Sequence, residues 1–229
     1  MPIETHPLTT HIGGRMTGID VRKSLTPTEV DAINAGVDAD TYQKLSAIAP
    51  TVPQSDGDAF FEPWKDQAKA IGQAVYQSGQ MTSLINGVDK GFTAFADKYP
   101  QFKNKRVALL QSKLHDDNVV ATTGWRTEFL TQMGLTIPES IASLAVDQER
   151  AFIPRDKIIS VLGAADLLIW TTDSDKDQAD LLANPDVAGL RSRSVFTTKD
   201  QAGAIAYASP LSYPLVADQL PPLIANILH

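Results

Sequence analysis

The chain has 229 residues, of which 43% are hydrophobic and 21% charged, and its formal net charge is −7. This is the balance of a globular protein with a full core, long enough for one large domain or two small ones. The sequence has no cysteine and no block rich in lysine and arginine, which excludes disulfide frameworks, thiolate metal sites and cysteine nucleophiles and argues against a nucleic acid or anionic membrane partner.

Residues 1–59 predict a small and incomplete α/β lobe. Residues 1–24 show no periodicity, and we expect a loose leader there. Short strands are predicted at residues 30–34 and 46–52, with a helix at 38–45 between them. Two short strands and one helix cannot bury both faces of a sheet, so this first lobe is expected to be partial.

Residues 60–102 predict two connecting helices. The first begins near Pro63, and the second ends at Tyr99, because the ring of Pro100 disfavours helix in the residue before it. At 1.5 Å per residue, the stretch from 81 to 99 spans roughly 28 Å, which suits a strut between two domains. The apolar face of each helix is read from a 3.6-residue period: Trp64, Ala68, Ile71 and Val75 in the first, and Met81, Leu84, Ile85, Val88, Phe92, Phe95, Ala96 and Tyr99 in the second.

Residues 103–229 predict a complete α/β domain with a parallel sheet. Continuous apolar runs at 106–111 and 165–170 are typical of strands covered on both faces, and a third strand is expected at 195–197. Helices alternate with these strands, as in parallel α/β proteins. They are expected at residues 124–133, 156–162, 176–182 and 212–228.

Ligands of open parallel sheets bind at the carboxyl ends of the strands. Three polar loops therefore qualify, at residues 112–118, 171–175 and 198–202. Lys113 in the first loop and Trp170 at the end of the second strand are secondary candidates for ligand contacts.

Catalytic and metal-binding signatures are weak in this sequence. His115, Asp116 and Asp117 are residue types that ligate metals, but adjacent residues rarely converge on one ion, so a solvated loop is favoured over a metal site. No G-x-S-x-G elbow and no phosphate-binding glycine loop occurs. We therefore predict no enzymatic activity and no resident cofactor.

Trp125 and Arg126 form the most informative pair, because they open a helix directly after residues 122–124. An arginine beside an aromatic ring at a loop–helix junction suits an anionic, conjugated ligand, through charge-assisted hydrogen bonds and stacking. The alternative is a packed tryptophan beside a solvated arginine, and the sequence leaves both open.

Six segments, in order and spread over about residues 30–228, together resemble the iron-siderophore substrate-binding proteins of ABC importers. The resemblance implies two α/β lobes joined by one long helix, the class III periplasmic-binding-protein fold, with the ligand in the cleft between the lobes. The segments are Asn34–Val37, Tyr42–Val52, Phe61–Trp64, Ala70–Ala74, Ile158–Trp170 and Tyr207–Pro214.

The same resemblance implies a function in capture and delivery. Such proteins bind ferric siderophores, heme or cobalamin outside the cytoplasmic membrane, in the periplasm or cell envelope, and hand them to the permease subunits. The ligand would be gripped by aromatic and cationic side chains. The expected contacts are Trp125, Arg126 and Tyr207 in the C-terminal lobe and Asn34 and Tyr42 in the first lobe.

Asp156 is the expected contact with the permease. In the family, a docking acid lies in a run like Ser-Arg-Glu-x-Leu, and Pro154-Arg155-Asp156-Lys157-Ile158 resembles it, with aspartate in place of glutamate. The alternative is a carboxylate at a helix start, favoured there by the helix dipole.

The chain also departs from the family pattern. Members usually begin with a signal peptide, often with a lipidated cysteine, followed by several strands before the first matching segment. The resemblance therefore implies an N-terminally truncated member with an incomplete first lobe. The leading hypothesis is a ferric-siderophore-binding protein; the alternatives are a heme or cobalamin binder of the same fold, or a non-transporting interaction or dimerising protein derived from it. An α/β hydrolase is disfavoured by the missing nucleophile motif.

Overall fold

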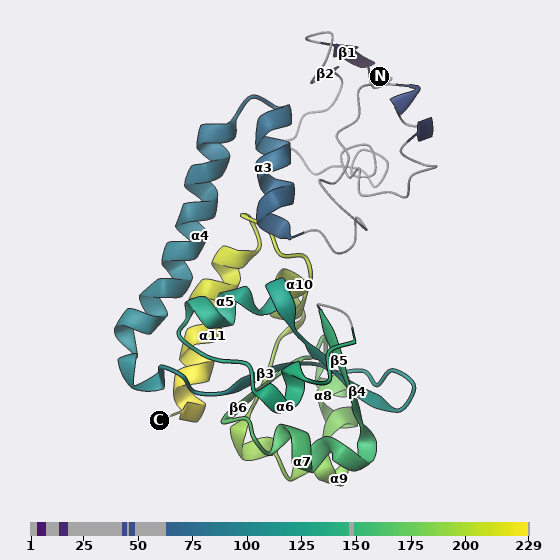
Figure 1. The fold of residues 1–229 in the computed structure, drawn as a ribbon, viewed down its shortest axis with the longest axis vertical. Helices are drawn as coiled ribbons and strands as arrows, with labels where there is room; N and C mark the ends of the chain where they lie inside the picture. Colours follow the sequence, from purple (N-terminus) through teal and green to yellow (C-terminus); the bar gives the residue numbers. More distant parts are fainter. Residues whose placement is uncertain are drawn as a thin grey trace. The chain divides into compact units, whose positions relative to one another are not determined.

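The computed structural model describes residues 43–44, 46–48, 63–146 and 149–228, and the backbone of residues 4–7 and 14–17 (Figure 1). The chain divides into two units, Met1–Ile85 and Asn86–His229. Helix α4 (Ser78–Lys98) begins in the first unit and ends in the second. The expected division into a partial lobe, a connecting segment at 60–102 and a C-terminal lobe stays a prediction.

The described part of the first unit begins with a short hairpin. Strands β1 (Glu4–Pro7) and β2 (Gly14–Thr17) pair antiparallel, in a stretch predicted to be a loose leader. Residues 43, 44 and 46 are helical and residues 47–48 form a turn, so the strand predicted from residue 46 does not begin there. The strand predicted at 30–34 lies outside the described residues.

Helix α3 (Trp64–Ala74) follows Pro63, as predicted, but its buried face differs from the predicted one. Ile71 and Val75 are 46% and 56% exposed. The buried face instead passes through Gly72, where a Cβ atom would lie 2.6 Å from Cβ of Met81. The glycine thus lets the start of α4 approach α3 more closely than any larger residue would. The buried residues of α3 are Trp64, Ala68 and Gly72.

Helix α4 confirms the predicted strut in extent. It ends at Lys98, and a 3-10 helix, η2 (Pro100–Phe102), follows directly. The predicted apolar stripe is buried only in part, since Leu84 is exposed and Met81 half-buried. The buried stripe consists of Ile85, Val88, Phe92 and Phe95.

The second unit contains a five-stranded mixed sheet in the order β5-β4-β3-β6-β7. The three predicted strands are present and parallel to one another. Two antiparallel strands, β4 and β5, were not predicted and extend the sheet on the other side of β3. The strands are β3 (Val107–Gln111), β4 (Asn118–Thr122), β5 (Arg150–Pro154), β6 (Leu167–Thr171) and β7 (Ser194–Phe196).

A tight hairpin turn returns the chain from β3 into β4. Asp116 and Asp117 both adopt positive φ, 47° and 65°, and His115 and Asn118 exchange backbone hydrogen bonds of 2.9 Å. Two positive φ values are what a two-residue type I′ hairpin loop requires, and aspartate tolerates them better than most residues. The loop expected at 112–118 is therefore a hairpin.

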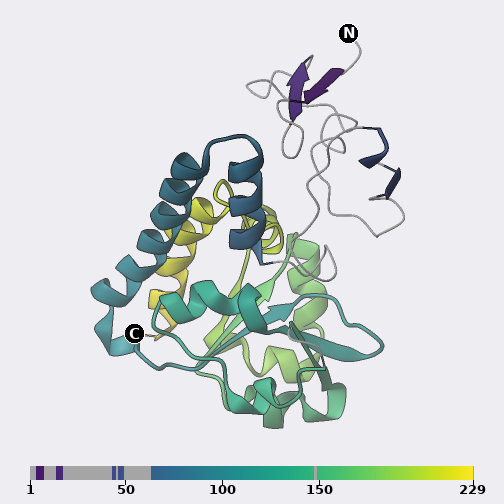
Figure 2. The ribbon, with the colours of Figure 1, turned by 45° about the horizontal axis from the view of Figure 1, so that its top comes forward.

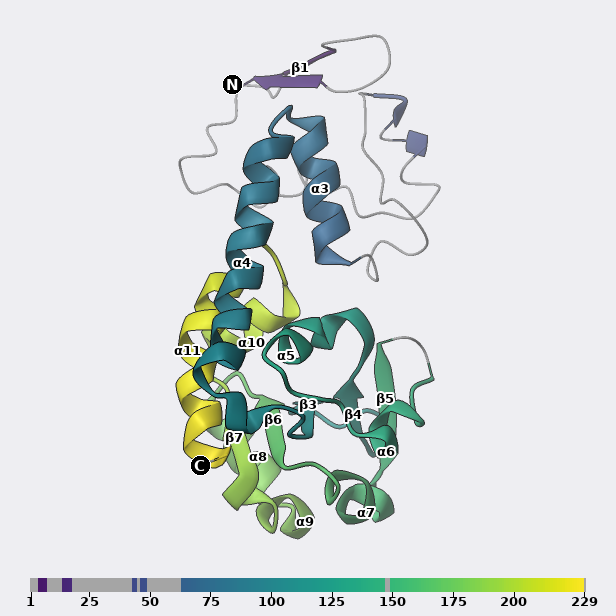
Figure 3. The same cartoon turned by 60° about the vertical axis from the view of Figure 1, so that its left-hand side comes forward.

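Helices cover the sheet on both faces, giving three layers (Figures 1 and 3). One face carries α6 (Glu139–Ala142), α7 (Ile158–Leu162), α8 (Asp175–Leu182) and α9 (Pro185–Ala188). The other carries the part of α4 after Ile85 together with α5 (Glu128–Gln132), α10 (Lys199–Ala206) and α11 (Tyr213–Leu228). The remaining turns are the 3-10 helices η3 (Gly124–Thr127), η4 (Arg155–Lys157) and η5 (Arg191–Arg193).

Helix α4 is anchored in the second unit by α11, which runs beside it in all three views (Figure 2). A Cβ atom at Gly91 would lie only 3.0 Å from Cβ of Ala217, so the glycine lets the two helices pack this closely without a shift of either one. Rings of Phe92, Phe129 and Tyr213 meet at the same place, with centroids 5.4 to 5.7 Å apart. Aromatic pairs at such distances stabilise a helix contact beyond simple area burial.

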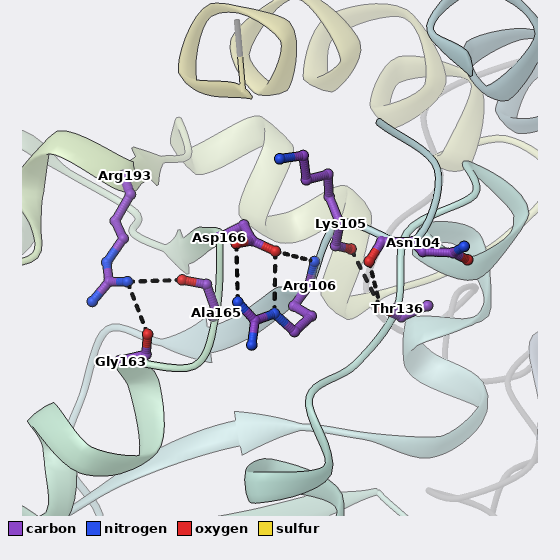
Figure 4. Close-up of polar contacts among 8 residues, drawn as sticks. All are labelled: Asn104, Lys105, Arg106, Thr136, Gly163, Ala165, Asp166 and Arg193. Atoms are coloured by element: carbon purple, nitrogen blue, oxygen red, sulfur yellow. Dashed lines mark hydrogen bonds and ion pairs between the residues drawn. The ribbon is translucent and has the colours of Figure 1, made fainter. Parts of the chain in front are cut away.

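A polar cluster joins the starts of the three parallel strands (Figure 4). The Asp166 carboxylate accepts hydrogen bonds from the backbone N–H of Arg106 at 2.8 Å and from its Nε and Nη2 at 3.2 Å. These bonds hold the pKa of Asp166 below its ordinary value. Arg193 donates to the carbonyls of Gly163 and Ala165 at 3.1 and 2.9 Å. These residues therefore have a structural role, because their polar groups form hydrogen bonds with one another.

Within the described ranges, every helix is too short or too polar to serve as a membrane span.

Candidate ligand-binding site

The candidate site lies where β4 ends and β5 begins. These strands pair antiparallel with Thr122 opposite Arg150, so the residues just beyond the pair also face each other. The backbone N–H of Thr123 donates to the carbonyl of Glu149 at 2.7 Å. Gly124 then adopts φ of 63°, and the chain turns into η3, which carries Trp125 and Arg126. The register of two strands thus brings Glu149 to a pair 23 and 24 residues earlier in the chain.

Glu149 binds both members of that pair. Its Oε2 accepts a hydrogen bond from Nε of Arg126 at 2.9 Å, and its Oε1 accepts one from Nε1 of Trp125. The Arg126 guanidinium carbon lies 4.5 Å from the centroid of the Trp125 ring, within the range of a cation–π contact. The Glu149 side chain is 5% exposed and the Arg126 side chain 28%. One buried carboxylate therefore orients a tryptophan and an arginine that both retain solvent-accessible surface.

The end of α10 supports the same arginine from the other side. Nη1 of Arg126 donates to the carbonyl of Ala206 at 3.4 Å, and Tyr207, the next residue, caps the helix and is 81% exposed. The hydroxyl of Ser212 donates to the carbonyl of Tyr207 at 2.8 Å, which shapes the loop that leads into α11. The structure therefore places three predicted contacts, Trp125, Arg126 and Tyr207, on adjoining segments of one unit.

Two buried hydroxyl groups, those of Tyr213 and Thr123, belong to segments near the arginine. Burial raises the pKa of Tyr213, while the Arg126 charge works in the opposite direction, so the phenol stays neutral at physiological pH. The side-chain hydroxyl of Thr123 is buried and has no hydrogen-bond partner among the described residues. An open pocket of about 420 Å³ lies between α10 and the start of α11, lined among others by Gly203, Leu211 and Leu215.

Two other predicted contacts lie elsewhere. Lys113 follows the carboxyl end of β3. Strand β4 runs back antiparallel, so Trp125 lies toward the opposite end of the strands, where β3 begins. Lys113 is exposed and pairs with Asp173 at 3.6 Å. The prediction for Trp170 is contradicted, because this residue is fully buried and its Nε1 donates to Ser194 in the core. Asn34 and Tyr42 lie outside the described residues.

The remaining candidates are polar surface residues. Asp156 is exposed in η4, just before α7, as the docking prediction requires. On the hairpin turn, Nε2 of His115 lies 3.6 Å from a carboxylate oxygen of Asp116. Across the described part of the chain, no group of three or more His, Asp or Glu side chains could hold a metal ion.

Comparison with known proteins decides the family. The family described as periplasmic binding protein matches residues 24–202, more than half of the chain. The chain belongs to this family. Its members are solute-binding proteins that work outside the cytoplasmic membrane. A search of curated protein sequences found no match.

Several solved structures resemble the chain as well. A periplasmic solute binding protein from Mycobacterium smegmatis is 54% identical, with a TM-score of 0.78 over 89% of this chain and 73% of that one. PiaA from Streptococcus pneumoniae, in complex with ferrichrome, is 20% identical, with a TM-score of 0.67 over 85% and 67%. FhuD2 from Staphylococcus aureus with bound ferrioxamine B is 17% identical, with a TM-score of 0.62 over 84% and 73%. The last two show the fold alone.

Sequence reasoning missed one residue of this periplasmic binding protein's site, Glu149. The residue directly precedes a strand that was not predicted. The available signal was the apolar alternation of Arg150–Pro154, whose inward residues are Ala151 and Ile153. That alternation predicts a half-buried strand, which would have placed Glu149 at a strand end.

Proposed function

We propose that the chain captures a ferric siderophore and delivers it to an ABC importer. The observation that carries this proposal is the oriented Trp125–Arg126 pair on η3, held by a buried carboxylate. Support comes from the 54% identical periplasmic solute binding protein, and from two structures of the same fold that hold ferrichrome and ferrioxamine B.

The binding chemistry follows from the residues in hand. A ferric siderophore presents metal-bound oxygens that carry partial negative charge, and these are acceptors for a guanidinium. The Trp125 ring and the exposed Tyr207 ring offer apolar faces for the organic part of the chelate. Since Glu149 already orients Trp125 and Arg126, little side-chain freedom is lost on binding. Asn34 and Tyr42 are proposed as further contacts from the first lobe.

The proposal includes no chemical step. The protein binds and releases its cargo, the iron belongs to the chelate, and no resident cofactor is required. The permease subunits are the proposed partner, with the exposed Asp156 as a docking contact, and the site of action is the periplasm or cell envelope, as in the family.

Intrinsic tryptophan fluorescence tests the proposal directly. Of the three tryptophans, Trp64 and Trp170 are buried and Trp125 is half-buried, so Trp125 is the expected reporter. Titration with a ferric hydroxamate siderophore should quench the emission with saturation, and Trp125→Phe should remove most of that quenching. Heme and cobalamin, titrated in the same way, test the alternative ligands of the fold. Saturable binding of either one, with no response to any ferric siderophore, would sink the proposal.

One observation favours a second candidate function, self-association. In the described part of the first unit, Ile71, Val75, Tyr76 and Leu84 leave large apolar surface exposed, and such surface often marks a protein–protein contact. The molar mass in solution, measured by light scattering with and without siderophore, separates the two. A tight dimer with no siderophore affinity would favour the interaction protein, and a monomer that binds siderophore would favour the transport function.

A further inference from the structure

We propose that Glu149 sets the charge class of the ligand. By compensating the charge of Arg126, it adapts this site to a ferric chelate without net charge, such as a trihydroxamate, and against a trianionic ferric tricatecholate. The inference rests on the proposed function and names the substrate class of the same site.

The charges of Arg126 and Glu149 lie close enough together to cancel each other at the site. Nε of Arg126 and Oε2 of Glu149 are 2.9 Å apart, so the pair acts as a dipole rather than as a free cation at any distance longer than its own size. The Glu149 side chain is 5% exposed, and a charge shielded from water is screened less than a charge on the surface. The attraction that a lone guanidinium would exert on an anion is therefore largely cancelled at this site.

Neighbouring charges do not restore a positive site. Glu128, two residues after Arg126 and the first residue of α5, is negatively charged and acts on the pKa of Tyr213 in the opposite direction to Arg126. Helix α10 contributes Lys199 and Asp200 to the adjacent pocket, one charge of each sign. Arg150, which follows Glu149 at the start of β5, adds one positive charge. Arg126 and Arg150 are therefore balanced by Glu149 and Glu128, and these four residues of the second unit carry no cationic excess.

The arginine still serves a neutral ligand. Its side chain keeps 28% of its surface in solvent and lies against the Trp125 ring, so a chelate meets polar guanidinium surface and an aromatic face without meeting net charge. Three hydroxamates lose one proton each when they bind ferric iron, which gives a neutral complex. Three catecholates lose two protons each, which gives a complex with three negative charges. Only the second complex needs a cationic excess that this site does not offer.

The test compares two ratios of affinity. Wild-type protein, Glu149→Gln and the control Glu139→Gln are each titrated with ferrichrome and with a ferric tricatecholate, by fluorescence and by equilibrium dialysis. The glutamine keeps one hydrogen-bond acceptor and removes the charge, and the exposed Glu139 on α6 reports the effect of net charge alone. Wild-type protein should bind ferrichrome at least about tenfold more tightly than the tricatecholate, and Glu149→Gln should narrow that ratio by about tenfold or more.

The outcomes separate this inference from the function beneath it. If wild-type protein prefers the tricatecholate, or if Glu149→Gln weakens both chelates by the same factor, the inference is overturned and the proposed function stands. If wild-type protein binds neither chelate, the proposed function fails and the inference fails with it. Should Glu149→Gln not fold, Glu149→Asp replaces it, because aspartate keeps the charge and shortens the side chain. This variant should bind both chelates more weakly but keep the wild-type ratio of the affinities for ferrichrome and the tricatecholate. A ratio that falls by about tenfold in Glu149→Asp would refute the inference.

Discussion

Breaking the Arg126–Glu149 pair from the arginine side should destabilise the protein strongly. Arg126→Met keeps much of the side-chain volume but removes the Arg126 charge from beside the Glu149 carboxylate, which is 5% exposed. Loss of one partner of a fully buried pair typically costs 3–5 kcal/mol. Because Arg126 is 28% exposed and the Trp125 Nε1 hydrogen bond remains, we expect about 2–3 kcal/mol here.

The double variant Arg126→Met/Glu149→Gln provides the control. With the charge on residue 149 removed as well, no ionised group remains buried, and most of the lost stability should return. The free energy of unfolding, measured by urea denaturation at pH 7, gives all four corners of a double-mutant cycle. For a chain of this length, 2–3 kcal/mol corresponds to a fall in Tm of roughly 4–12 °C.

Two results would refute this reasoning. A single variant within about 0.5 kcal/mol of wild type would mean that the pair contributes as little as an exposed salt bridge. A double variant less stable than Arg126→Met would mean that Glu149 acts through contacts other than the arginine. In either case the Arg126–Glu149 ion pair would not be what stabilises the site.

Three further predictions concern other groups. Asp166→Asn should cost about 1 kcal/mol at pH 7. Because the hydrogen bonds from Arg106 hold the pKa of Asp166 low, this contribution is complete above the ordinary carboxyl pKa and lost as the pH falls through the folded value; the difference in unfolding free energy between the two proteins should shrink from pH 7 to pH 3, and an unchanged difference would count against the pair. Burial raises the pKa of Tyr213, so its contribution is complete below the ordinary tyrosine pKa of about 10 and lost above it. Tyr213→Phe should therefore lose less stability than wild type between pH 9 and pH 11, and parallel curves for the two proteins would contradict this. Asp156→Ala should leave siderophore affinity unchanged but lower the ATPase activity that the loaded protein stimulates in its importer; full stimulation would remove Asp156 from the docking surface.

Long, periodic elements could be predicted from the sequence because their pattern repeats over several turns or strands. Helix α4 repeats its apolar positions to Phe95 and stops before Pro100, where backbone chemistry forces the end. Strands β3 and β6 are continuous apolar runs that only a position covered on both faces explains. In these elements local pattern and tertiary environment agree, so the local pattern was sufficient.

The hairpin strands were missed because their local signals pointed elsewhere. Asp116 and Asp117 look like a solvated loop, but at positive φ they form the turn that returns the chain antiparallel. The Asn118–Thr122 segment has three apolar residues, against four in the equally long β3, and it directly follows the charged residues of the turn. Because β4 was not predicted, the sequence could place Trp125 and Arg126 after a loop but could not show at which end of the strands they lie.

The charge of the candidate site follows from that same pairing of β4 with β5. The register sets Thr122 opposite Arg150, and it is fixed by buried partners, Ala121 with Ala151 and Val119 with Ile153. A slip of one residue turns every side chain of a strand to the other face. It would also move Arg150 toward the place now held by Glu149, and a compensated arginine would become a cluster of two cations. Apolar packing in the sheet core thus determines which charges lie together at the candidate site, and no motif near Arg126 could have revealed this.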